Sequence, residues 1–157
     1  KYRDAVVKNT NLLLKLAAAT SLPVLVTEQN PPGLGPTVPE IMENFPEGTR
    51  VIDKMSFTAC TPDTRKALFE FDRPKIIVTG CETHVCVYQT VRDLLEDGYT
   101  VHLVEDAVCS RFKQNYRSGL ELMKQMGAVI TNTESIFFDI LKIAGTPEFK
   151  ALSPLLK

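Results

Sequence analysis

The sequence predicts a three-layer α/β domain, Rossmann-like and doubly wound, with a mostly parallel sheet and helices on both faces. Its 157 residues, 44% of them hydrophobic and 24% charged, suit one core and a single domain over residues 1–157. Short β-branched runs alternate with amphipathic helical stretches, and this alternation is typical of right-handed βαβ units. The runs cover residues 23–27, 50–53, 75–79, 100–104 and 128–131.

The chain opens with a helical pattern rather than with a strand. The apolar stripe of this first helix consists of Tyr2, Val6, Leu13, Leu16 and Ala17. A doubly wound domain that begins this way has a helix with no strand leading into it. We therefore expect a further parallel strand ahead of residue 1, beside run 23–27 or run 75–79. On this interpretation the domain is incomplete at its N-terminus.

The connection over residues 28–49 is long and rich in proline and glycine. Loops of more than about 12 to 15 residues without secondary structure are uncommon and usually functional. This one leaves the carboxyl end of run 23–27, at the edge where open α/β sheets bind ligands. A surface excursion stiffened by proline is an equally good interpretation.

Later strands and helices follow in regular alternation. Run 75–79 is almost continuously apolar, which predicts a strand covered on both faces. Amphipathic stripes then predict three helices. They consist of Val87, Val91, Leu94 and Leu95, of Tyr116, Leu120 and Met123, and of Ile136, Phe137, Ile140 and Leu141.

Residues that begin and end helices stand at the ends of the helical stretches. Thr61 before Pro62 is typical of an N-cap followed by a proline in the first turn. Thr131 and Glu134 have the spacing of a capping box. Glycines at positions 98 and 127 predict the ends of two further helices.

Composition excludes several classes of partner. The formal net charge of −1 and the pI near 6.2 give no basic footprint for nucleic acid or anionic lipid. No stretch approaches the roughly 18 apolar residues of a membrane span. Four cysteines without a CxxC pair indicate reduced thiols, so we expect a cytoplasmic protein, with an organelle such as the mitochondrion as the alternative.

The most informative stretch covers residues 78–87, where a buried strand ends in Gly80, a polar turn follows, and a helix begins near Cys86. A thiol at a helix N-terminus faces the positive end of the macrodipole and unpaired N–H groups, which favour the thiolate. Such a cysteine can act as a nucleophile. The alternative is a buried cysteine that behaves as a small hydrophobic residue.

Two charged residues follow other predicted strands. Lys54 ends run 50–53, where a lysine can hold a thiolate or polarise a carbonyl group, although such a lysine is more often a solvated surface charge. Asp106 comes shortly after run 100–104. We favour a structural role for Asp106, in which its carboxylate caps a neighbouring loop.

Several of these segments resemble one known family. Residues 80–87, GCETHVCV, resemble the GxxTxxCV signature of the isochorismatase-like cysteine hydrolases, and residues 54–57, KMSF, resemble that family's KxxF segment. Residues 27–40 are similar to the branch called isochorismatase domain-containing proteins. The resemblance continues through residues 104–107 and 133–135, so it spans nearly the whole chain.

The resemblance implies a catalytic triad of Asp, Lys and Cys, with Cys86 as nucleophile and Lys54 as the lysine. The backbone N–H groups of Glu82 and Cys86 would form the oxyanion hole, and a cis peptide bond between Cys81 and Glu82 would shape the loop. The family's Asp lies at the end of a strand ahead of the first helix, and Asp4 does not match it.

The resemblance also bears on cofactors. Nicotinamidases of this superfamily carry a zinc site of the form Asp-x-His plus His, which His84 and His102 do not match. We therefore expect no metal and no other cofactor. Isochorismatase proper fits less well, because it acts on an ether without needing the cysteine that this chain retains.

Together these features predict hydrolysis of a small-molecule amide or ester through Cys86. Gln29, Phe57 and His84 are candidates for the substrate pocket on position alone. A second hypothesis is a catalytically silent binding or scaffold protein, and a third is a redox-sensing Cys86 with Cys81 as its resolving partner. By analogy with the family we expect a homo-oligomer.

Overall fold

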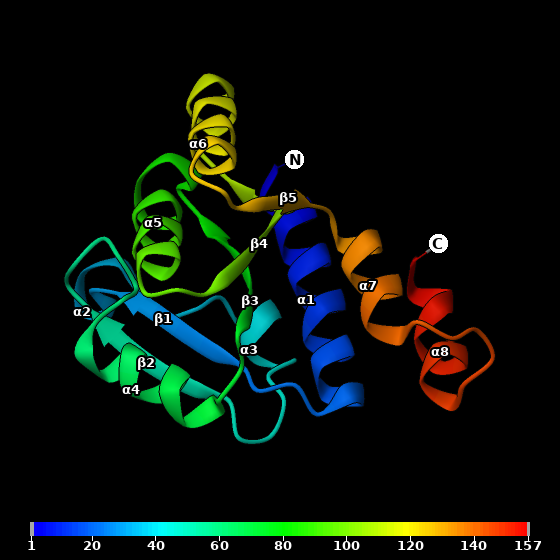
Figure 1. The fold of residues 1–157 in the computed structure, drawn as a ribbon. Coiled ribbons are helices and arrows are strands. Elements are labelled where there is room, and N and C mark those ends of the chain that lie inside the picture. Colours follow the sequence, from blue (N-terminus) through cyan, green and yellow to red (C-terminus); the bar gives the residue numbers. More distant parts are fainter. Residues whose placement is uncertain (1, 157) are drawn as a thin grey trace.

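Two parallel β-sheets lie at the centre of the computed structural model, which describes residues 2–156 (Figure 1). The first pairs β1 (Leu25–Gln29) with β2 (Arg50–Lys54). The second has the order β3-β4-β5, from β3 (Lys75–Cys81), β4 (Thr100–Cys109) and β5 (Val129–Thr131). All five predicted strands are therefore present, and the α/β fold class is confirmed.

Helices cover both faces of the β3-β4-β5 sheet. The longer helices are α1 (Tyr2–Thr20), α4 (Pro62–Phe71), α5 (Tyr88–Glu96), α6 (Lys113–Gln125), α7 (Thr133–Leu141) and α8 (Pro147–Leu152). Short turns are α2 (Pro31–Leu34), α3 (Pro39–Met42), a π-helical turn (Thr83–Val87) and a 3₁₀ turn (Ser153–Leu156). Helices α5 and α6 lie on one side of this sheet, and α1 and α7 on the other (Figure 1).

The two faces of this sheet have separate hydrophobic cores. The first core consists of Cys60, Val78, Val87, Val91, Leu94, Val101, Leu103, Val108, Met123 and Ala128. The second consists of Leu16, Val104, Ala107, Ile136, Phe137 and Leu152. Consecutive residues of β4 point to opposite faces, so that Leu103 enters the first core and Val104 the second.

Strand β4 contains an irregularity that the sequence did not predict. Val78 pairs with Leu103, but Gly80, two residues further on, pairs with Val108. Three extra residues of β4 are therefore accommodated between these pairs. Asp106 lies within this bulged part of the strand rather than after its end.

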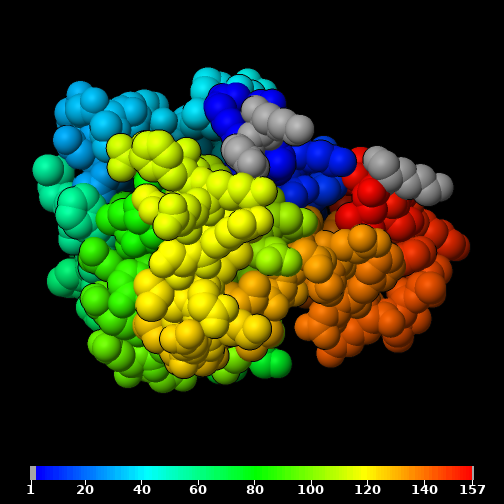
Figure 2. Space-filling view, turned by 90° about the horizontal axis from the view of Figure 1, so that it is seen from above, coloured from blue at the N-terminus to red at the C-terminus, as the bar shows by residue number. Residues whose placement is uncertain are grey.

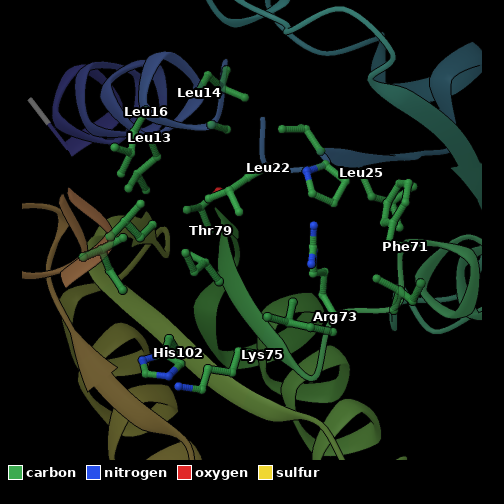
Figure 3. Close-up of a pocket in the computed structure, with 18 of the residues that line it drawn as sticks. Leu13, Leu14, Leu16, Leu22, Leu25, Phe71, Arg73, Lys75, Thr79 and His102 are labelled. Carbon is green, nitrogen blue, oxygen red and sulfur yellow. The ribbon is translucent and has the colours of Figure 1, made fainter. Parts of the chain in front are cut away.

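A groove with a volume of about 470 Å³ separates β1 from β3 (Figure 3). It is lined by Leu13 and Leu16 of α1, Leu25 of β1, and Ile77 and Thr79 of β3. Ile77 remains 36% exposed there, so the prediction that β3 is covered on both faces was wrong on this side. Within residues 2–156, neither β1 nor β3 pairs with a strand along the groove. The additional parallel strand expected ahead of the first helix would fit between them, and it stays a prediction.

The predicted beginnings and ends of helices were confirmed in part. Thr61 caps α4 by accepting a hydrogen bond from Thr64 N, and Gly98 and Gly127 follow α5 and α6 with positive φ angles of 89° and 103°. The N-cap of α7 is Asn132 instead of Thr131, because the amide oxygen of Asn132 accepts from Ser135 N at 2.8 Å.

The connection over residues 28–49 is also more ordered than predicted. It contains α2 and α3, both of which begin with proline, so it is not free of secondary structure. Arg3 of α1 forms an ion pair with Glu40 of α3, and Asn11 donates to the backbone oxygen of Glu40 at 2.8 Å. These contacts hold the connection against the first helix.

The C-terminal helices lie at one side of the molecule, next to α1. Figure 2 shows them in orange and red beside the blue N-terminal segment. Leu152 of α8 is buried in the second core together with Leu16 of α1. No helix within residues 2–156 has the length and apolar character needed to cross a membrane.

Candidate active site

Lys54 is a buried cation at the carboxyl end of β2. Its side chain is only 8% exposed, and its Nζ donates to Gln29 Oε1 at 2.7 Å and to the backbone oxygens of Ser56 and Phe57 at 3.0 Å each. These acceptors are neutral, and no carboxylate within residues 2–156 forms an ion pair with Lys54. The alternative of a solvated surface charge was therefore wrong, and the catalytic role of Lys54 stays a prediction.

The surroundings of Lys54 change its acidity in two opposing ways. Burial lowers the pKa of Lys54, because the charged ammonium group loses hydration. The electrostatic interaction with Cys86 acts in the opposite direction and raises the pKa of Lys54. The two residues therefore interact electrostatically, although Lys54 ends β2 of one sheet and the Cys86 turn follows β3 of the other.

Cys86 lies in the π-helical turn Thr83–Val87 that joins β3 to α5. The sequence placed this cysteine at the start of a helix, and the π turn adds a wider loop ahead of the α-helix proper. Glu82 begins the turn with φ 58° and ψ 64°, and its backbone oxygen accepts hydrogen bonds from the N–H groups of Val85 and Val87. A non-glycine residue in this left-handed region is uncommon and marks a locally strained position.

The peptide bond between Cys81 and Glu82 is trans, as are the others within residues 2–156. The expectation of a cis bond at this place was therefore wrong. The chain reverses instead through the left-handed conformation of Glu82, which turns the backbone directly after the strand. The carboxylate of Glu82 lies 3.3 Å from Arg111 Nε, and this ion pair helps to hold the turn.

Thr90 links the Cys86 turn to the segment after Lys54. Thr90 was not among the residues predicted for the site. Its Oγ1 donates to the backbone oxygen of Cys86 at 2.7 Å and accepts from the N–H of Ala59 at 2.8 Å. The spacing of four residues from Cys86 on a helix is the signal that could have indicated this contact. One hydroxyl group therefore joins the two segments that carry the lysine and the cysteine.

The three predicted pocket residues occupy different surroundings. Gln29 and Phe57 lie beside Lys54: Gln29 accepts from Lys54 Nζ and donates to Met55 O at 2.9 Å, and Phe57 exposes its ring to solvent. His84 lies in the turn itself and contacts the segment after β4 and the first turn of α6. Its Nδ1 lies 3.0 Å from Ser110 Oγ and its Nε2 lies 3.2 Å from Asn115 Nδ2.

A small cavity of about 250 Å³ adjoins the lysine. Its lining consists of Asn30, Pro31, Pro32, Asp53, Lys54 and Met55. The larger groove between β1 and β3 is apolar and contains neither Lys54 nor Cys86 among its lining residues. Lys54 therefore borders the smaller hollow, whose lining does not include Cys86, at the carboxyl end of β2, the kind of edge where open α/β sheets bind ligands.

Asp106 has the structural role that the sequence favoured. Its Oδ1 accepts hydrogen bonds from both the N–H and the Oγ1 of Thr133, each at 2.8 Å, so the carboxylate fixes the first turn of α7. Among residues 2–156, no three histidine, cysteine, aspartate or glutamate side chains are grouped closely enough to hold a metal ion.

Comparison with known proteins identifies the family. The model of the isochorismatase domain matches residues 2–135. The chain belongs to the isochorismatase family. The secreted isochorismatase effector Isc1 of Phytophthora sojae is 42% identical over 97% of this chain and 74% of its own length. Isochorismatase domain-containing protein 2 of Xenopus laevis is 37% identical over 92% of this chain and 69% of its own, which confirms the predicted branch.

Solved isochorismatase-like structures share the fold. A Caenorhabditis elegans protein named MAR1 ribonuclease superimposes with a TM-score of 0.94 at 38% identity, over 99% of this chain and 80% of that one. YcaC of Escherichia coli, described as an octameric hydrolase of unknown specificity, matches with a TM-score of 0.82 at 26% identity, over 89% of this chain and 70% of its own. The parallel sheets with flanking helices are thus those of the isochorismatase family.

Proposed function

We propose that this isochorismatase family member hydrolyses a small carbonyl compound, an amide or an ester, with Cys86 as the nucleophile. The observation that carries this proposal is the electrostatic proximity of Cys86 to Lys54, a buried cation that has only neutral hydrogen-bond partners within residues 2–156. A fixed positive charge beside a thiol stabilises the thiolate, which is the reactive form.

The first half of the reaction forms a covalent intermediate. A base removes the proton from Cys86, and the thiolate sulfur attacks the carbonyl carbon of the substrate. The carbonyl oxygen gains the negative charge, and the backbone N–H groups of Glu82 and Cys86 stabilise it by donating hydrogen bonds to this oxygen. Collapse of this tetrahedral species breaks the bond to the leaving group, which takes the proton back from the base and departs as an amine or an alcohol, so that the base is free again.

The second half releases the acyl group. Water loses a proton to the same base and attacks the thioester carbon, and the bond to Cys86 breaks to give a carboxylic acid and the free thiol. Lys54 remains charged in both halves and stabilises the negative charge on sulfur. Gln29 supports this role because it anchors the lysine ammonium group through the 2.7 Å hydrogen bond.

We propose that the base is an aspartate at the carboxyl end of the expected strand in the groove between β1 and β3. The groove supports this idea, because it runs beside β3, whose carboxyl end leads into the Cys86 turn. The lack of a carboxylate partner for Lys54 within residues 2–156 supports it as well. An aspartate between Lys54 and Cys86 would complete the triad that the family resemblance implies.

The decisive experiment compares two cysteine variants of the same protein under reducing conditions. We expect Cys86→Ser to lose at least about a hundredfold in turnover of a reactive ester such as 4-nitrophenyl acetate. The matched control, Cys109→Ser, should retain the wild-type rate. Equal turnover by wild type and Cys86→Ser would contradict the proposal, and hydrolysis no faster than without protein in both would favour a binding or scaffold role for the fold.

Cleavage of RNA is a second candidate, because the C. elegans neighbour that superimposes with a TM-score of 0.94 is named a ribonuclease. The net charge of −1 argues against it, since binding of a polyanion needs a basic surface. A screen of amides, esters, thioesters and a labelled RNA would separate the two. Hydrolysis of RNA that survives Cys86→Ser would replace our proposal.

We further propose a homo-oligomer in a reducing compartment such as the cytosol. Large apolar side chains on the surface support self-association, among them Phe69 at 82% and Leu34 at 74% exposure, as does the octameric YcaC neighbour. The four free cysteines support the compartment, whereas the P. sojae relative is named a secreted protein. A monomeric mass at micromolar concentration would contradict the oligomer.

A further inference from the structure

We propose that Cys81 and Cys109 form an oxidisable dithiol that closes reversibly into a disulfide bond. The two residues end β3 and β4, and they are paired directly across the two strands. The Sγ atom of Cys109 lies 3.8 Å from the Sγ atom of Cys81. This pair is separate from the Cys86 thiol, and the proposal does not depend on the catalytic role of Cys86.

The backbone geometry suits a disulfide bond. Neighbouring strands lie about 4.8 Å apart, and disulfides form where the Cα atoms are about 4.4 to 6.8 Å apart. Cys81 and Cys109 are register partners at this spacing, so closing the bond requires rotation of the side chains and little movement of the strands. Cys81 is exposed and Cys109 is half-buried, so that an oxidant can reach the first sulfur from solvent.

The bulge in β4 creates this pairing. In an unbroken register that continued from the Val78–Leu103 pair, Cys81 would lie opposite Asp106. The three additional residues of β4 move Cys109 into that place instead. The two cysteines are 28 residues apart in the sequence, and nothing in their spacing predicts that they meet.

The hydrogen bond between the sulfurs prepares one of them for oxidation. Cys109 donates to Cys81, and this bond lowers the pKa of Cys81 to about 7, although burial and the nearby Glu82 carboxylate act in the opposite direction. The same bond raises the pKa of Cys109. Cys81 is therefore the more acidic thiol and the one that attacks, and Cys109 is the thiol that resolves.

A peroxide supplies the oxidant, and the electrons balance in two steps. The Cys81 thiolate attacks one oxygen of hydrogen peroxide, which forms an S–O bond, breaks the O–O bond and, with one proton, releases water. Cys109 then attacks the sulfur of the resulting sulfenic acid, which forms the S–S bond and releases a second water. Two thiols lose two electrons in total, and one peroxide is reduced to two waters.

The bond would join two strand ends that already support the turn after β3. Glu82 follows Cys81 directly and forms an ion pair with Arg111, two residues beyond Cys109. Ser110, next to Cys109, contacts His84 of the turn at 3.0 Å. A disulfide bond at this level adds a covalent tie to these two polar contacts, so oxidation would rigidify the start of the Cys86 turn.

Peptide mapping of the full chain tests the proposal. Reduced protein is treated with hydrogen peroxide, remaining thiols are blocked with N-ethylmaleimide, and the protein is digested with trypsin and a protease that cleaves after glutamate. Cleavage after Glu82 separates Cys81 from Cys86, so the two cysteines appear on different peptides. We expect a peptide containing Cys81 disulfide-bonded to one containing Cys109, and its loss on treatment with dithiothreitol.

Two variants make the result specific. Cys86→Ala should still form the bond, whereas Cys109→Ser should leave Cys81 as a sulfenic acid that a dimedone probe captures. Circular dichroism of each variant checks that it is folded. Two results would overturn the proposal. The first is N-ethylmaleimide on both Cys81 and Cys109 after peroxide treatment, which would show that both thiols stayed reduced. The second is a disulfide bond between Cys81 and Cys86 in place of the expected one.

Discussion

The two sheets of this protein differ sharply in how they are packed. The β3-β4-β5 sheet has a hydrophobic core on each face, and five residues of β4 are completely or nearly completely buried: Val101, Leu103, Val104, Ala107 and Val108. In β1 and β2 no hydrophobic side chain is buried, and Lys54 is the only buried residue between positions 18 and 59. The candidate active site joins one residue from each region.

The two regions contribute to the geometry of the site in different ways. Cys86 follows β3, whose sheet has a packed hydrophobic core on each face, whereas Lys54 belongs to the two-stranded sheet, in which no hydrophobic side chain is buried. A few directed contacts, such as the hydrogen bonds of Thr90, connect the two. We therefore expect substitutions in the first region to act mainly on stability, and substitutions at the connection to act mainly on turnover.

The largest expected effect compares two leucines on the two sheets. Leu103 is fully buried in the first core, so Leu103→Ala should lower the free energy of unfolding by about 2–5 kcal/mol. Leu25 is half-buried beside the groove, and Leu25→Ala should cost about 1 kcal/mol. Urea denaturation measures both. Equal losses would contradict the account, because they would show that the groove side is packed as tightly as the core.

The next effect concerns the contact between α6 and the π turn. A Cβ atom at Gly119 would lie 3.0 Å from His84 Cα and 3.0 Å from Thr83 O, which are backbone atoms of the turn. Helix propensity alone predicts that Gly119→Ala raises the free energy of unfolding. Because of the clash, we expect the substitution to lower it instead, by about 1–3 kcal/mol. Ser118→Ala, at an exposed position of the same helix, is the control, and a stabilised Gly119→Ala would show that the turn yields easily.

Substitution of Thr90 tests the connection itself. Thr90→Val keeps the shape of the side chain but removes the donor to Cys86 O and the acceptor for Ala59 N. We expect the free energy of unfolding to fall by about 1–3 kcal/mol. For the proposed reaction, we expect kcat to fall by a larger factor than KM rises, because the turn shifts relative to Lys54. Thr90→Ser retains the hydroxyl group and should stay near the wild type. A reduced kcat in Thr90→Ser as well would point to packing of the methyl group instead.

The smallest effect is a dependence on pH. Burial lowers the pKa of Lys54 in the folded state, whereas the unfolded value is about 10.4. Between these two values the unfolded chain binds more protons, so the stability of the wild type relative to Lys54→Met should rise with pH and then level off. Urea denaturation from pH 7 upward, with Cys86→Ala in both proteins, measures this difference. A difference that falls with pH would mean that the pKa of Lys54 is raised.

Regular features of the fold could be predicted from the sequence because they depend on local patterns. The strand runs, the Thr61 N-cap and the glycines after α5 and α6 follow from periodicity and backbone preference. The capping role of Asp106 was favoured because a carboxylate shortly after run 100–104 can cap a neighbouring segment.

Other features depend on contacts between distant segments and carry no local signal. The bulge in β4, the pairing of Cys81 with Cys109 and the double role of Thr90 appear only when the strands are assembled. The left-handed trans conformation of Glu82 replaced an expected cis bond, because either geometry reverses the chain after a strand. The N-cap of α7 moved by one residue, since Asn132 competes with Thr131 for the same role.

The most direct test of the central claim is the rate at which iodoacetamide modifies each cysteine of the native, reduced protein. The measurement uses a Cys81→Ser background, which removes an exposed thiol whose pKa is lowered to about 7. We predict that Cys86 reacts at least about tenfold faster than Cys60 or Cys109, and that Lys54→Met slows Cys86 without slowing Cys109. Equal modification of Cys86 and Cys109, or a Cys86 rate that Lys54→Met leaves unchanged, would contradict the account.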